Sequence, residues 1–320
     1  MTNALKRTMP GSAAPTAASA VARFWDGDVA YAFRRSPVAI GSALVLLVLL
    51  TGAMLAPWIA PYNPFDLASL NLMDSNQPPA WAEAGTSAHL LGTESQGRDM
   101  LSTIMHGTRI SFLVGAAAVV FAVGVGVGVG LLAGYAGGNT DAILMRMADV
   151  QLSFPAILIA LLVNGVVRIS VPQDRQEALQ IYVVIFAIGI SYWPQFARTV
   201  RGSTMVERGK EYIMAARVIG LSGPRIMLTH ILPNVLGPVT VIGTLTLGLA
   251  MVTEATLSYL GVGLPPSQLS LGTLIRLGQD YLSSGEWWIA VFPGMALMAA
   301  VLSINLLGDW LRDALNPRLR

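Results

Sequence analysis

The chain has 320 residues, of which 54% are hydrophobic and only 12% are charged. Because a soluble domain carries about 25% charged residues, this composition indicates a polytopic membrane protein. The net charge of +2 does not suggest a nucleic-acid partner, and the lack of cysteine excludes disulfides and cysteine-ligated metal sites.

The first 36 residues are predicted to lie on the cytoplasmic side of the membrane. Residues 1–22 are rich in Ala, Ser, Thr and Pro, which favours a disordered tail. Residues 23–36 mix aromatic side chains with arginines. That mixture favours an amphipathic helix in the membrane interface, and an ordinary aromatic belt at the start of the first span explains it equally well. Arg34 and Arg35 resemble a twin-arginine export signal, but the apolar run after them, about 23 residues, is too long for a signal peptide.

Six segments are apolar and free of Asp, Glu, Lys and Arg, and they approach the roughly 20 residues that a transmembrane helix needs. They are residues 37–60, 110–136, 150–167, 178–197, 233–253 and 287–308. The sequence therefore predicts an all-α membrane protein with six transmembrane helices. The first span is 37–60, an external segment covers 61–109, and a core with the other five spans covers 110–316.

Two of these spans carry unusual residues. In the second, the strict alternation GVGVGVG at 124–130 indicates a strand when taken by itself. A lone strand leaves its backbone unsatisfied in lipid, so a glycine-rich helix that packs closely on its neighbours is the better interpretation, with a merely flexible helix as the alternative. In the third span, Pro155 is expected to kink a helix that begins earlier and includes Arg146 and Asp149.

The distribution of basic residues orients the chain, because cytoplasmic loops carry an excess of Lys and Arg. One side of the predicted membrane holds fifteen of them: Lys6, Arg7, Arg23, Arg34, Arg35, Arg146, Arg198, Arg201, Arg208, Lys210, Arg217, Arg225, Arg312, Arg318 and Arg320. The other side holds five: Arg98, Arg109, Arg168, Arg175 and Arg276. Both termini and the loop between spans four and five are therefore predicted to be cytoplasmic.

The chain lacks the motifs of several enzyme classes. Gly209 and Lys210 are followed by Glu211 rather than Ser or Thr, and the upstream glycine is missing, so there is no Walker A motif. The three histidines are scattered and form no HExxH motif. No catalytic, cofactor-binding or metal-binding residue is expected.

Polar residues within the spans suggest a pathway. Ion-coupled secondary transporters bury ionisable groups near mid-membrane. Glu254 is the best candidate for such a group, but it lies towards the outer end of the fifth span. A polar group bonded at the external mouth of the bundle is therefore favoured over proton coupling. Asn164, Gln195 and Glu254 are the candidate lining of a translocation path, and they speak against a membrane scaffold without one.

The cytoplasmic region 205–233 predicts two short helices. The first runs to Ile219, and Gly220 follows it at the position where a left-handed residue is favoured. Ser222 can cap the second helix, and Pro224 falls in its first turn. Pro233 is expected to end the second helix and lead into the fifth span.

Small side chains in this region predict a docking surface. Ala215 and Ala216 let another protein approach closely, and Ala216 is expected to face that partner. The region then forms a compact basic knob that docks a partner or transmits force. An amphipathic linker resting on lipid headgroups is the alternative.

The sequence AARVIGLSGPRIMLTHILPN at 215–234 resembles the EAA loop of ABC importer permeases, E-A-A-x3-G-x9-I-x-L-P. Ala215, Ala216, Gly220, Leu232 and Pro233 match in register, whereas Met214 and His230 stand where Glu and Ile are usual. Glu211, one turn earlier, is not a register match. Residues 90–111, 145–155 and 254–266 resemble the dipeptide and oligopeptide (DppC/OppC-type) branch, although the last continues to Leu271-Gly272 rather than Trp-Gly.

This resemblance covers residues 24–316 and implies a permease subunit of an ATP-driven importer in a bacterial inner membrane. The substrates of this branch include dipeptides, oligopeptides, nickel and glutathione. The implied partners are a second permease, two ATPase subunits that bind ATP and Mg²⁺, an external solute-binding protein and membrane lipid. The competing interpretation is an ion-coupled secondary transporter. The residues implied at the ATPase junction are Glu211, Ala215, Ala216, Arg217, Gly220, Leu221, Arg225 and Pro233.

Overall fold

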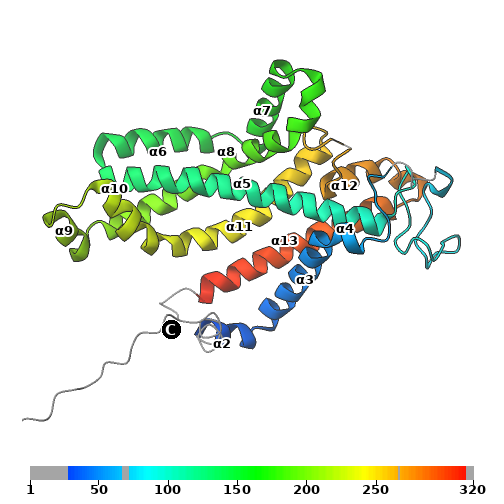
Figure 1. Ribbon diagram of the computed structural model, residues 1–320, viewed down its shortest axis with the longest axis horizontal. Helices are drawn as coiled ribbons and strands as arrows, with labels where there is room; N and C mark the ends of the chain where they lie inside the picture. Colours follow the sequence, from blue (N-terminus) through cyan, green and yellow to red (C-terminus); the bar gives the residue numbers. More distant parts are fainter. Residues whose placement is uncertain (1–27, 67–71, 266, 315–320) are drawn as a thin grey trace, which may run out of the picture.

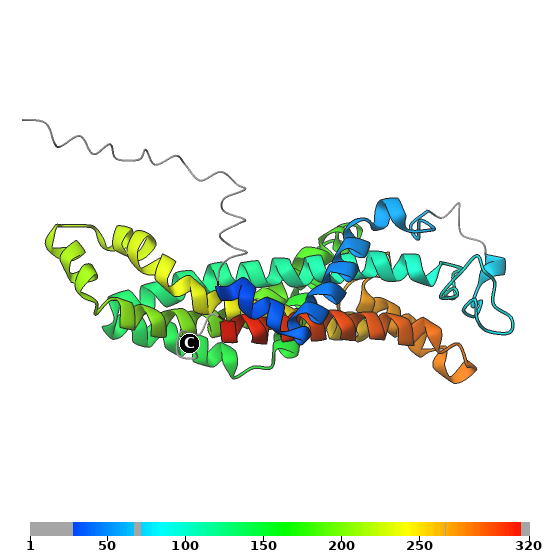
Figure 2. The same ribbon diagram turned by 90° about the horizontal axis from the view of Figure 1, so that it is seen from below.

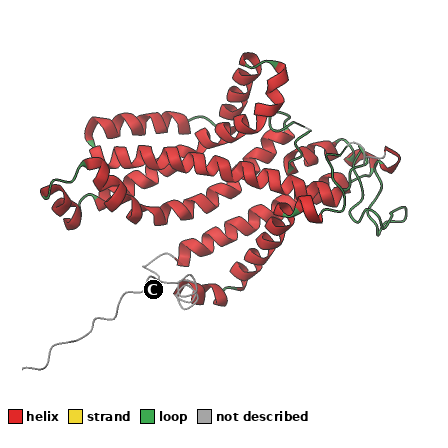
Figure 3. Ribbon diagram, viewed as in Figure 1, coloured by secondary structure: helices red, strands yellow, loops and turns green. Residues whose placement is uncertain are grey.

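The computed structural model describes residues 28–66, 72–265 and 267–314. These residues form helices and connecting loops without any strand, as the sequence predicts (Figure 3). The α-helices are α2 (Asp28–Arg35), α3 (Pro37–Met54), α4 (Ala56–Ile59), α5 (Met100–Ala136), α6 (Gly138–Leu152), α7 (Ala156–Ser170), α8 (Gln173–Glu207), α9 (Glu211–Val218), α10 (Gly223–Ile226), α11 (Leu232–Tyr259), α12 (Leu271–Gln279) and α13 (Trp288–Ala314). Short 3₁₀ turns lie at η1 (Leu72–Asp74) and η3 (Leu282–Ser284), and η2 (Met227–Ile231) is π-helical.

Five helical stretches of the described chain are long and apolar enough to cross a membrane. They are Pro37–Met54, Met100–Ala136, Arg175–Glu207, Gly223–Tyr259 and Trp288–Ala314. A sixth is present if α6 and α7, which meet at 89°, together make one span. The predicted six spans therefore hold when this bent pair is counted as one.

The glycine-rich segment is helical, and its glycines divide between two faces of α5. A Cβ atom on Gly126, Gly130 or Gly134 would lie 2.5–2.8 Å from atoms of α8, among them the carbonyl oxygens of Trp193, Ala197 and Arg201. By contrast, Gly124 and Gly128 face open space. The four-residue spacing of the first set lets the two backbones approach closely, as in other membrane helix pairs. The sequence alternation is thus a small-residue helix seam.

Several helix ends differ from the prediction. The second span begins at Met100 rather than near 110, because the Asp99 carboxylate accepts hydrogen bonds from the Ser102 N–H at 2.8 Å and from its hydroxyl at 2.7 Å. An N-terminal cap of this kind stabilises an early start. The first span ends at Met54, and the short α4 follows it. The last part of the segment expected to be external, residues 100–109, therefore forms the first turns of α5.

Pro155 breaks the third span rather than kinking it. α6 ends at Leu152, and Pro155 is the N-cap residue of α7. Proline lacks the N–H that would continue the helix, and the preceding residues are biased away from helical geometry. Arg146 and Asp149 lie within α6, as predicted. In Figure 1, α7 turns away from the axis along which α5, α6 and α8 run.

The bundle is elongated and has two different ends (Figures 1 and 2). α9 and α10 project at one, here named the α9 end. The loop at 72–99 and α12 lie at the opposite end, here named the α12 end. The N-terminal α2 contacts α13 through an edge-on packing of Phe33 on Trp310, with ring centroids 5.2 Å apart. The predicted helix at 23–36 is thus helical over Asp28–Arg35, and the predicted tail at 1–22 lies outside the described residues.

Candidate functional site

The loop that joins α8 to α11 (residues 208–231, called the α9–α10 loop) forms the tip of the α9 end (Figure 1). Its turn is left-handed at Gly220, where φ is +83°. The Gly220 N–H donates to the Arg217 carbonyl at 3.0 Å, and the Leu221 N–H donates to the Ala216 carbonyl at 3.1 Å. These two bonds form a Schellman turn, which glycine adopts most readily. The predicted left-handed conformation of Gly220 is confirmed.

The second helix of the loop runs directly into the fifth span. Ser222 is the N-cap residue of α10 and Pro224 lies in its first turn, although the Ser222 side chain makes no capping bond. α10 continues through π-helical η2 into α11, because the Leu232 N–H donates to the Met227 carbonyl. Pro233 therefore does not end the helix, because the wider π turn just before it lets the helix continue into α11.

The inner face of α9 is packed against the bundle. Ile213 is 0% exposed and Ala216 is 4% exposed, and both belong to a buried cluster with Phe196 and Val200 of α8. The expectation that Ala216 faces a partner is therefore wrong. Residues three apart share one helix face, and in this eight-residue helix that face covers the chain's own core. The small side chain of Ala216 lets α9 lie close to the bundle.

Several apolar side chains at and beside the C-terminal end of α9 are open to solvent. Val218 is 87% exposed, Ile219 is 75% exposed and Met214 is 50% exposed. The helix ends at Val218, one residue before the predicted end at Ile219, which is the C-cap residue before the Gly220 turn. Glu211 and Ala215 are also exposed. The surface available to another molecule is thus an apolar tip (Met214, Val218 and Ile219) beside Ala215.

The basic residues of the loop have different surroundings. The Arg217 guanidinium lies 5.1 Å from the centre of the Tyr135 ring, a cation–π arrangement. Arg208 donates to the carbonyls of Gly134 and Tyr135 at 3.0 and 3.1 Å, at the C-terminus of α5. Arg225 is exposed. Of the other predicted junction residues, Leu221 packs against the buried cluster and Pro233 is exposed.

A chain of polar contacts links the loop to the helices on either side of it. Glu207, the last residue of α8, accepts from the Lys210 ammonium at 2.6 Å and from the Tyr212 hydroxyl at 2.5 Å. The hydrogen bond to Glu207 raises the pKa of Tyr212 to about 12. The same hydroxyl accepts from the Asn234 amide of α11 at 3.2 Å.

Two of the three predicted path residues lie together near the α12 end. Glu254 is fully buried, and its carboxylate accepts from the hydroxyls of Ser111 at 2.7 Å and Ser258 at 2.8 Å. Asn164 is also buried, and its amide donates to the Val262 carbonyl. Gln195 of α8 stands in the sequence between Trp193 and Phe196, which belong to the same buried cluster as Ile213. The structure thus brings Asn164 and Glu254, but not Gln195, to the loop after α11.

Sequence reasoning missed the partners of Glu254 and Asn164. Ser111 and Ser258 also accept the N–H groups of Leu271 and Leu264, each at 3.2 Å. Gln180 donates to the Val262 and Gly263 carbonyls at 3.2 and 2.7 Å. These side chains satisfy the backbone of an irregular loop beside the spans, where unsatisfied groups are costly. The position of Ser258, four residues after Glu254, was the available signal.

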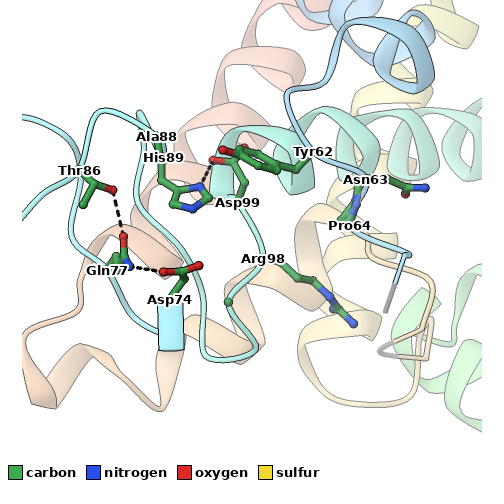
Figure 4. Close-up of a pocket in the computed structure, with 11 residues that line it drawn as sticks. Tyr62, Asn63, Pro64, Asp74, Gln77, Thr86, Ala88, His89, Arg98 and Asp99 are labelled. Atoms are coloured by element: carbon green, nitrogen blue, oxygen red, sulfur yellow. Dashed lines mark hydrogen bonds and ion pairs between the residues drawn. The ribbon is translucent and has the colours of Figure 1, made fainter. Parts of the chain in front are cut away.

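The α12 end holds a cavity of about 270 Å³ (Figure 4). His89 Nδ1 and the Asp99 carboxylate lie 3.1 Å apart on its wall, and the Tyr62 ring packs on His89 with centroids at 4.9 Å. Gln77 donates to Asp74 at 2.7 Å and accepts from Thr86 at 3.0 Å. Within the described residues, no three His, Asp or Glu side chains are grouped to hold a metal ion.

Comparison with protein families matches residues 126–320 to the binding-protein-dependent transport system inner membrane component. Residues 23–79 match the N-terminal transmembrane domain of oligopeptide transport permease C. The chain belongs to the family of binding-protein-dependent transport system inner membrane components. Membership in this permease family agrees with the multi-span helical architecture and with the resemblance of residues 215–234.

Individual relatives of this permease cover nearly all of it. It is 35% identical over 302 residues to the di/tripeptide transport system permease protein DppC of Pseudomonas aeruginosa, and the matched region covers 94% of this chain and 93% of the relative. It is 38% identical over 307 residues to the dipeptide transport system permease protein DppC of Escherichia coli K12, with 96% of both chains covered. The inward-facing MetNI methionine ABC transporter has a similar fold, with a TM-score of 0.54 and 19% identity over 68% of this chain and 98% of that chain.

Proposed function

We propose that this permease subunit carries peptides across a bacterial inner membrane, within an importer driven by partner ATPases. A second permease completes the translocation path, two cytoplasmic ATPase subunits bind ATP and Mg²⁺, and an external binding protein delivers the substrate. Relatives named for dipeptide and di/tripeptide transport support the peptide substrate. Dipeptides and tripeptides are therefore the first substrates to test.

The observation that carries the coupling role is the exposed tip of the α9–α10 loop. Val218 and Ile219 are 87% and 75% exposed on a helix that is anchored to the bundle by buried residues on its other face. An exposed apolar cluster held on a rigid support is suited to insertion into a groove on another protein. We assign the ATPase subunits as that partner, with Met214, Ala215, Val218 and Ile219 at the contact.

A charge placed on the tip tests this assignment. Val218→Asp should sharply reduce co-purification of the ATPase subunits with the permease and abolish ATP-dependent peptide uptake, because a carboxylate would be buried in the contact. Leu282→Asp is the matched control, since Leu282 is also exposed (46%) but lies at the α12 end. It should leave the ATPase bound. If Val218→Asp retains both the ATPase and uptake, the lipid-headgroup alternative is favoured.

The proposed orientation places both termini and the α9 end in the cytoplasm, as the basic residues predict. The chain has no cysteine, so single cysteines can be introduced without background labelling. A membrane-impermeant thiol reagent should label Leu282→Cys in sealed cells and should label Val218→Cys only after the membrane is opened. Labelling of Val218→Cys from outside would reverse the assigned orientation.

A further inference from the structure

The α9–α10 loop is joined to the bundle by two backbone connections that differ from regular α-helix. On one side, α8 ends at Glu207 and a turn at residues 208–210 leads into α9. On the other side, the continuous helix Gly223–Tyr259 contains the π-helical turn Met227–Ile231 just before Pro233. A proline in a regular helix would clash with the carbonyl four residues earlier and donates no hydrogen bond. π turns of this kind mark bends and functional sites.

Side chains span both connections. At the first, the Glu207 carboxylate reaches past the turn to Lys210 at 2.6 Å and to Tyr212 at 2.5 Å. At the second, the Asn234 amide donates to the carbonyl of His230, within the π turn, at 2.7 Å. The same amide nitrogen donates to the Tyr212 hydroxyl at 3.2 Å. The Tyr212 hydroxyl is therefore bonded to one side chain at each connection, Glu207 at the first and Asn234 at the second.

The Tyr212 hydroxyl is a hydrogen-bond donor and acceptor at the same time. A phenol donates one hydrogen bond and can accept others. Here it donates to a carboxylate whose side chain is 12% exposed, and it accepts from Asn234. Hydrogen bonds to an ionised group are stronger than those between neutral groups. Tyr212 thus fixes α9 relative to the end of α8 and to the start of α11 at the same time.

The two helices joined in this way lead to different parts of the bundle. α8 packs along α5 through the glycine seam, whereas α11 packs most extensively against α13 and also contacts α5, α8 and α12. Within the α9–α10 loop, the Tyr212 hydroxyl bonds to Glu207 of α8 and to Asn234 of α11, so displacement of α9 reaches the ends of both helices through one group. We propose that the Tyr212 hydroxyl is a positioning group that makes α8 and α11 respond together to displacement of α9. This inference rests on the proposed coupling function.

The first test measures the geometry without any partner. Spin labels on Val218→Cys and Leu236→Cys, the latter 46% exposed on α11, report the distance from α9 to α11 in the purified full chain. Tyr212→Phe keeps the ring and removes only the hydroxyl, so the distance distribution should broaden. Tyr182→Phe, on an exposed tyrosine of α8, is the matched control and should leave it narrow. An unchanged distribution in Tyr212→Phe would overturn the proposal.

The second test measures coupling in the assembled importer. Tyr212→Phe should still bind the ATPase subunits, but peptide transported per ATP hydrolysed should fall about two- to tenfold, the equilibrium effect of one net hydrogen bond. Asn234→Ala should lower the same ratio, and the double variant should be no worse than the poorer single variant. An unchanged ratio in Tyr212→Phe, or loss of ATPase binding, overturns the positioning role. Failure of the parent chain to bind any ATPase instead contradicts the proposed function.

Discussion

At the residue scale, Glu254 illustrates how a buried carboxyl group serves the fold. Its two carboxyl oxygens each accept from one serine; Ser258 in turn accepts the N–H of Leu264 in the loop after α11, and Ser111 accepts the N–H of Leu271, the first residue of α12. Through these two serines, the carboxyl group holds the backbone in place at Leu264 and at Leu271. This supports the interpretation of Glu254 as a bonded group at the mouth of the bundle rather than a proton carrier.

Replacing Glu254 should therefore destabilise the chain. Glu254→Ala leaves the hydroxyls of Ser111 and Ser258 without their acceptor inside the protein, at a cost of about 1–3 kcal/mol. Glu254→Gln keeps one acceptor oxygen and should lose less. Thermal unfolding in detergent measures both variants, with exposed Glu83→Ala as the control. Unfolding of Glu254→Ala at the parent temperature would contradict this role.

Tyr212 gives a prediction for alkaline pH. The hydrogen bond to Glu207 raises its pKa from 10.0 to about 12 in the folded chain. A pKa raised on folding contributes stability that is complete below the unfolded value and is lost as pH rises through the folded value. The stability difference between the parent and Tyr212→Phe should thus be constant below pH 10 and shrink towards pH 12. Chemical unfolding at a series of pH values measures it, and a difference that shrinks well below pH 10 would contradict the bond.

At the element scale, the α5–α8 seam depends on which glycines face α8. Gly130 has the Ala197 carbonyl 2.6 Å from the place of a Cβ atom, whereas Gly128, two residues earlier, has open space there. Helices approach this closely only where small residues line the contact. The seam therefore sets the spacing of α5 and α8.

The two glycines should respond oppositely to alanine. Gly130→Ala should lower the thermal unfolding temperature, because a methyl group would force the helix backbones apart. Gly128→Ala should be neutral or stabilising, since alanine favours a helix over glycine by about 1 kcal/mol. Both are measured on the purified chain in detergent. Equal effects of the two substitutions would show that the seam does not depend on close approach.

At the scale of the whole molecule, hydropathy predicts the number and order of the spans because a membrane helix must be apolar along most of its length. It does not predict helix ends such as Met100, where the cap at Asp99 is a local polar contact. Nor does it distinguish a kink from the break at Pro155, which depends on packing around α7. The left-handed Gly220 was predictable because it needs only a local turn.

Contacts between distant residues were beyond the sequence. Glu254 and Ser111 are separated by 143 positions, and the bonds of Tyr212 reach from α8 to α11. The burial of Ala216 could not be predicted either, because either face of a short amphipathic helix can pack against the bundle, and the sequence does not say which one does. The sequence predicted the two short helices of the α9–α10 loop and its turn at Gly220, but it did not show which of the loop's alanines is exposed.

We propose that movement of substrate through this permease is driven by ATP hydrolysis on partner subunits. Reconstitution in liposomes with the second permease, the ATPase subunits and peptide-loaded binding protein tests it directly. Peptide uptake should require ATP and should be unaffected by a protonophore. Uptake that proceeds without ATP when a proton gradient is imposed, and that a protonophore abolishes, would contradict the account.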